Sequence, residues 1–116
     1  MLQDELLEID RGFWTEGEDY FREHVDERCV LIFTQMQGVY PRDDVAASAH
    51  DPRRWRDLEI SGAFAHRPSD DIAVLGYEAR VVRGDGTPYR AWIGSTYVRR
   101  DGAWRLTAHQ HTPVEG

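Results

Sequence analysis

The sequence predicts an α+β domain in which N-terminal helices pack on an antiparallel sheet. Three observations carry this prediction. Apolar residues near the N-terminus recur at helical spacing, whereas from Cys29 onward β-branched and aromatic residues fill strand-like runs. The dipeptide Asp101-Gly102, between two such runs, is typical of a two-residue hairpin turn. The predicted order is helix, helix, strand, helix and then four strands.

Two helices are expected before Cys29. An apolar stripe at three- and four-residue steps predicts a first helix that ends near Trp14, and it consists of Leu2, Leu6, Ile9 and Phe13. Thr15 and Glu18 then have the spacing of a capping box. We therefore expect a second, shorter helix over residues 16–24.

The remaining elements follow from strand-like runs and the turns that separate them. A first strand is predicted over residues 29–36, ended by a turn at Gln37-Gly38. A short helix over residues 41–50 begins at a proline, which suits a first helical turn. The four later strands are predicted over residues 58–66, 72–83, 88–99 and 103–112.

Composition limits the classes of protein to which the chain can belong. With 116 residues, 41% of them hydrophobic, the chain suits one folded domain over residues 1–116. It has 14 basic and 21 acidic residues, a net charge of −7, which disfavours nucleic acid as a partner. The N-terminus is acidic and no apolar run reaches the roughly 20 residues of a membrane span, so we expect a cytoplasmic protein without a membrane partner.

Strand register predicts which side chains share a face. Counting back from Asp101-Gly102, and centring the preceding hairpin on Gly86, gives one mostly apolar face with a few hydroxyl and amide groups. We predict that this face lines a ligand pocket, to which it contributes Tyr77, Ser95, Tyr97 and Gln110, and that Phe33, Met36 and Trp55 form the other walls. The opposite face is expected to carry a dimer interface formed by Trp92, His109 and His111.

Several segments together resemble a known superfamily. They are residues 13–17, 38–45 and 88–91, Trp55, Tyr77, and above all residues 95–106 and 109–113. In these the chain resembles the nuclear-transport-factor-2-like superfamily of ketosteroid isomerases and polyketide cyclases, and within it an uncharacterised bacterial branch. The resemblance implies a cone-shaped fold with a strongly curved, mixed or antiparallel sheet, a cavity beneath the helices, and a homodimer. The isomerases place a general base late in the first long strand, where residues 33–36 of this chain contain no acid.

Two sharper interpretations concern the histidines. His109 is a weak candidate for a general base, because its ordinary pKa lies near neutrality, but no nucleophile or orienting acid is identifiable beside it. His109 and His111 could also ligate a metal, with a third ligand from His66, Glu78 or His24. A structural role is favoured over both. We expect no metal site and no cofactor.

The leading hypothesis is a homodimer that binds a small, apolar organic molecule. Proton transfer on that molecule, as in isomerisation, cyclisation or dehydration, is the reaction class that would fit such a site. The alternative is a non-catalytic module for homodimerisation or protein interaction. In that case the chain's own side chains would fill the cavity.

Overall fold

The structure is a computed structural model and describes residues 1–51 and 53–114. Helix α1 (Leu2–Thr15) buries its apolar stripe through Leu6 and Phe13, and helix α2 (Glu18–His24) buries Phe21. The predicted capping box is wrong. Thr15 is the last residue of α1 and its hydroxyl donates to the Arg11 carbonyl at 3.3 Å, while Gly17 occupies the N-cap of α2.

The first strand starts earlier than predicted and belongs to a hairpin that the sequence analysis missed. Strand β1 (Val25–Ile32) follows α2 directly, and β2 (Gln37–Pro41) pairs antiparallel with it. The turn lies at residues 33–36, where the Phe33 amide donates to the Met36 carbonyl at 2.9 Å. Gln37-Gly38 therefore begins a strand, and the short helix α3 (Arg42–Ala47) follows it.

Four long strands complete the sheet. They are β3 (Trp55–Ser69), β4 (Ile72–Arg83), β5 (Pro88–Arg100) and β6 (Ala103–Pro113). The strand order is β2-β1-β6-β5-β4-β3, with β1 and β6 parallel and all other neighbours antiparallel. Asp101 and Gly102 both have positive φ, as the predicted tight turn requires. The predicted fold class, helices on a curved mixed sheet, is confirmed.

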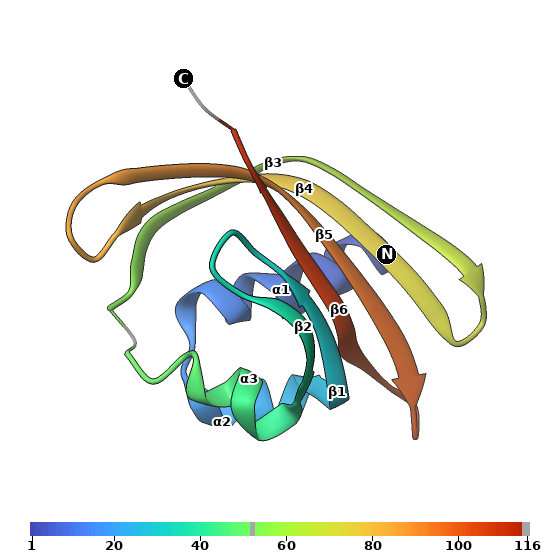
Figure 1. The fold of residues 1–116 in the computed structure, drawn as a ribbon. Helices are drawn as coiled ribbons and strands as arrows, with labels where there is room; N and C mark the ends of the chain where they lie inside the picture. The colour runs from blue at the N-terminus through green and yellow to red at the C-terminus, as the bar shows by residue number, and fades with distance from the viewer. Residues whose placement is uncertain (52, 115–116) are drawn as a thin grey trace.

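The sheet bends around the helices, so its concave face and the helices enclose the core (Figure 1). The β4 and β5 residues that point inward are almost completely buried, among them Leu75, Tyr77 and Tyr97. They pack on Leu6 and Trp14 of α1. The opposite face of the sheet is convex and open to solvent, and several large apolar side chains lie exposed on it.

Candidate ligand pocket

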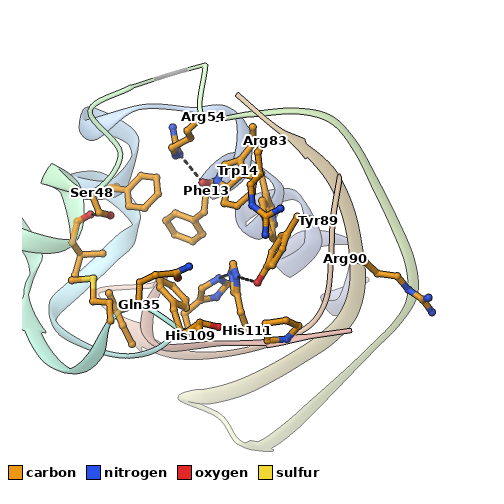
Figure 2. Close-up of a pocket in the computed structure, with 18 of the residues that line it drawn as sticks. Phe13, Trp14, Gln35, Ser48, Arg54, Arg83, Tyr89, Arg90, His109 and His111 are labelled. Carbon is orange, nitrogen blue, oxygen red and sulfur yellow. Dashed lines mark hydrogen bonds between the residues drawn. The ribbon is translucent and has the colours of Figure 1, made fainter. Parts of the chain in front are cut away.

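A cavity of about 710 Å³ opens between the helices and the concave face of the sheet (Figure 2). This volume lies within the range of small-molecule sites. Its wall is largely aromatic and apolar, with polar groups at a few positions. Residues of this wall include Phe13, Trp14, Phe33, Met36, Trp55, Tyr89, His109, His111, Arg54 and Arg83.

Aromatic rings pack against one another around the cavity and hold its shape. Trp55 lies between Trp14, at 5.1 Å between ring centroids, and Tyr89, at 5.4 Å. The His111 ring stacks on Trp14 at 5.1 Å and lies 4.4 Å from Phe33. Because these rings come from α1, β3, β5, β6 and the β1–β2 turn, tertiary packing forms the wall rather than any single element.

A chain of hydrogen bonds runs along one side of the pocket. The Ser95 hydroxyl lies 2.7 Å from His109 Nδ1, and His109 Nε2 lies 3.1 Å from His111 Nε2. His111 Nδ1 in turn lies 3.1 Å from the Tyr89 hydroxyl. All four imidazole nitrogens therefore have hydrogen-bond partners. The chain ends at the hydroxyl of Tyr89, a residue that lines the cavity (Figure 2).

Near the Ser95 end of this chain lies a fully buried carboxyl group, that of Asp10 on α1. Tyr77 and Tyr97 each donate to one of its oxygens, with the Tyr97 contact at 2.5 Å, and Trp14 Nε1 donates to the Tyr77 oxygen at 2.8 Å. The nearby Ser95 also favours the ionised form of the carboxyl and so opposes a rise of its pKa. Burial nevertheless raises the pKa of Asp10, because the interior disfavours the ionised form more than these donors favour it.

Burial also determines the charge of the two histidines. It lowers the pKa of His109 to about 4, and burial together with the neighbouring His109 lowers the pKa of His111 to about 3. Both rings are therefore neutral at pH 7, and each carries one hydrogen. A chain of neutral donors and acceptors can reverse its direction, so the Tyr89 hydroxyl can either accept from a ligand or donate to it.

The structure separates the residues predicted to line the pocket into three groups. Phe33, Met36 and Trp55 line it. Tyr77, Ser95 and Tyr97 point to the same side of the sheet but lie behind the wall, where they bind Asp10 or His109. The prediction for Gln110 is wrong, because its side chain points to the convex face and is exposed.

The predicted interface is corrected in the same way. Trp92 does lie exposed on the convex face, but His109 and His111 point inward, and His109 is only 7% exposed. The cause is a β-bulge: Tyr97 pairs with Leu106 as predicted, whereas Thr96 pairs with Ala108, so Thr107 is an extra residue in β6. Beyond the bulge every side chain of β6 faces the opposite way from its prediction.

The sequence analysis did not identify Asp10 or Tyr89 as site residues. A signal for Asp10 was present, because it lies four residues after Leu6 and three before Phe13, within the apolar stripe of α1. A carboxyl group at such a position must find buried donors. Tyr89 carries no such signal, since its partner His111 was assigned to the other face of the sheet.

Two chemical alternatives find no support in the geometry. In the part of the chain that the structure describes, no three His, Cys, Asp or Glu side chains gather in a way that could hold a metal ion. Cys29 is buried, and burial raises the pKa of its thiol to about 12, so it packs as a small apolar residue.

None of the described helices has the length and hydrophobicity needed to cross a membrane.

Comparison with known proteins shows the fold. No protein-family model matches the chain, and no curated protein matches it in sequence. Among solved structures, a candidate ketosteroid isomerase from Parabacteroides distasonis has a TM-score of 0.81 at 11% identity, over 99% of this chain and 89% of that one. A nuclear-transport-factor-2-like protein from Cytophaga hutchinsonii has a TM-score of 0.74 at 14% identity, over 96% and 97%. The chain thus has the nuclear-transport-factor-2-like fold.

A third solved structure adds a different functional class with the same fold. It is a candidate calcium/calmodulin-dependent kinase II association domain from Exiguobacterium sibiricum, with a TM-score of 0.75 at 18% identity, over 99% of this chain and 93% of that one. Proteins with this fold therefore include both a candidate enzyme and a candidate association domain. The fold alone does not choose between these functions.

Proposed function

We propose that this protein binds a small, largely apolar, ring-bearing organic molecule in the cavity between its helices and the concave sheet. The observation that carries the proposal is the cavity itself. Its volume is about 710 Å³, its wall is largely aromatic and apolar, and one group of polar side chains is formed by Tyr89 and the histidine pair. The reaction class suited to this array is proton transfer at a ligand atom that reaches the Tyr89 oxygen.

A neutral fluorescent probe tests the binding directly. N-phenyl-1-naphthylamine should bind with 1:1 saturation, brighten, and accept energy from Trp14 and Trp55, which both line the cavity. Ser48→Trp should reduce this binding, because Ser48 also lines the cavity and the larger side chain would occupy it. Ala47→Trp is the matched control, as the neighbouring position is exposed but does not line the cavity. A wild type that shows no saturable binding would refute the proposal, and so would a Ser48→Trp variant that binds normally.

We also propose that the protein associates with itself through the convex face of its sheet. Trp92 on this face is 45% exposed and Phe64 is 61% exposed. Four further apolar residues are exposed there, namely Val30, Ile32, Val39 and Val74. An apolar surface of this kind is typical of an interface between subunits. The candidate association domain with the same fold supports this second proposal.

Sedimentation of the purified protein distinguishes a dimer from a monomer. Trp92→Glu should convert a dimer into a monomer, because it places a charge within the apolar convex face. Gln3→Glu, on the exposed side of α1, should leave the mass unchanged. A wild-type monomer at micromolar concentration, or a Trp92→Glu variant that stays dimeric, would refute self-association through this face.

A further inference from the structure

We infer that the ligand of the pocket carries an anionic group, and that Arg83, with Arg54 beside it, recognises that group. This inference rests on the proposed binding function and names the chemical class of the ligand. The occupant would be an apolar, ring-bearing acid such as an aromatic carboxylate. Its rings would lie between the aromatic walls, and its charged end would lie at the arginines.

The charge of the pocket wall is opposite to that of the whole chain. The chain has 21 acidic and 14 basic residues. Nevertheless, the described residues that line the cavity include three arginines, Arg54, Arg83 and Arg90, and no acidic residue, although the Arg90 side chain points out of the pocket (Figure 2). A wall of this kind raises the local concentration of anions and repels cations.

The partners of these arginines separate Arg90 from the other two. Arg90 is neutralised by Glu78, with 3.2 Å between Nε and Oε1. Within residues 1–51 and 53–114, neither Arg54 nor Arg83 forms an ion pair. Two guanidinium groups at one cavity therefore lack a carboxylate partner of their own.

The carboxylates closest in sequence to the two arginines have other partners. Asp51, close in sequence to Arg54, accepts the Arg53 amide at 2.9 Å and also forms an ion pair with the Arg53 side chain at 3.5 Å. Asp85, close in sequence to Arg83, accepts the amide and the hydroxyl of Thr87 at 2.9 and 2.7 Å. Neither carboxylate forms an ion pair with Arg54 or Arg83, so the two guanidinium groups keep donors for a ligand.

Arg83 is held in a position that leaves donors for a ligand. Its guanidinium lies over the Tyr89 ring, 4.7 Å from the centroid. Among the described residues only its Nη1 finds partners, donating to the Thr87 hydroxyl at 3.2 Å and to the Pro88 carbonyl at 2.9 Å. The Nε and Nη2 groups remain for a carboxylate, whose two oxygens match the planar fork of a guanidinium.

Arg54 lies beside Arg83 because strands β3 and β4 are paired there. Trp55 pairs with Arg83, and the Gly84 amide donates to the Arg54 carbonyl at 3.1 Å. Arg54 Nη2 donates to the carbonyls of Phe13 and Glu16 at 2.8 and 2.9 Å, which fixes its charge near the end of α1. Figure 2 shows both arginines on the side of the pocket away from His109 and His111.

A matched pair of ligands tests the charge. 2-Naphthoate is ionised at pH 7, whereas 2-naphthamide has almost the same shape and no charge, and both can displace N-phenyl-1-naphthylamine. We expect the wild type to bind naphthoate about tenfold more tightly than naphthamide, the gain typical of one charge-assisted hydrogen bond. Arg83→Gln should remove this preference and leave naphthamide binding within about twofold of wild type.

Two further variants show whether the effect depends on charge at this site. Arg83→Lys should retain most of the preference, since the cation remains. Arg99→Gln should retain all of it, because Arg99 also stacks on an aromatic ring, Trp104 at 5.7 Å, but does not line the cavity. Equal binding of the two ligands by the wild type, or an unchanged preference in Arg83→Gln, would overturn the inference while leaving the binding proposal intact. A wild type that does not bind N-phenyl-1-naphthylamine at all would refute the binding proposal itself.

Discussion

The Nε2 atoms of His109 and His111 lie 3.1 Å apart, so a single hydrogen must lie between the two nitrogens for the contact to be favourable. If both rings presented a lone pair, or both a hydrogen, the contact would be repulsive. The condition is met when both rings are neutral and one carries its hydrogen on Nε2 while the other carries it on Nδ1. Protonation of the accepting ring at this nitrogen would bring two hydrogens together and break the contact within a buried wall.

This relationship predicts that acid destabilises the fold. The pKa of His109 is lowered to about 4 in the folded state from 6.5, so between these values the unfolded chain binds more protons. The stabilisation is present above pH 6.5 and is lost as the pH falls through this window. By linkage the loss for one such histidine is about 3 kcal/mol between pH 7 and pH 4.

Urea unfolding at several pH values between 7.5 and 4 measures this loss. His109→Asn should reduce the slope of stability against pH, because Asn keeps a polar contact with Ser95 and does not titrate. His66→Asn changes an exposed histidine and should keep the wild-type slope. If His109→Asn and wild type lose the same free energy of unfolding as the pH falls, the assignment of His109 as a neutral, buried histidine is wrong.

The sequence predicted the helices and the hairpin at Asp101-Gly102 because their signals are local. The apolar stripe of α1 and the turn residues lie within a few positions of one another. The positions of His109, His111 and Gln110 depend instead on the bulge at Thr107. Thr107 is β-branched and strand-compatible, so nothing local distinguishes it from a residue in regular register.

The site depends even more on tertiary structure. The contact between Asp10 and Tyr97 joins residues 87 positions apart, and that between Arg54 and the Phe13 carbonyl joins residues 41 positions apart. Periodicity assigns Tyr77 and Tyr97 to the concave face, but it does not show that a carboxyl group on α1 would be their partner. Whether a concave-face residue lines the pocket or lies behind its wall depends on how the helices pack on the sheet.

A second prediction concerns Asp10. Because burial raises its pKa, the stability it contributes is present below its ordinary value of 3.8 and is lost as the pH rises. This trend is opposite in sign to that of the histidines. Asp10→Asn should therefore become more stable relative to wild type as the pH increases from 4.5 to 7.5. The amide can still accept from one tyrosine and donate to the other.

Urea midpoints of the two proteins at both pH values give the comparison. Glu8→Gln, on the exposed side of the same helix, serves as the neutral control. A wild type that gains stability relative to Asp10→Asn as the pH rises would mean that the Tyr77 and Tyr97 donors stabilise the ionised carboxylate more than burial disfavours it. Asp10→Leu removes both acceptors from the buried tyrosines and should cost about 2–5 kcal/mol.

The last prediction tests how tightly α1 and α2 meet at the end of the pocket. A Cβ atom at Gly12 would overlap the ring of Tyr20, and that ring is held in place because its hydroxyl donates to the Ile9 carbonyl at 2.7 Å. The ring also packs on Phe13, with 5.5 Å between centroids. Gly12→Ala should therefore destabilise the protein by about 1–3 kcal/mol, although alanine is otherwise the better helix former.

Glu8→Ala is the matched control, because it also places an alanine in α1 but at an exposed position. That substitution should leave the urea midpoint almost unchanged. Gly12→Ala should also weaken N-phenyl-1-naphthylamine binding, since displacing Tyr20 shifts Phe13 in the pocket wall. A Gly12→Ala variant as stable as wild type would show that α2 can move away from α1, and that the wall at Phe13 is not fixed by this contact.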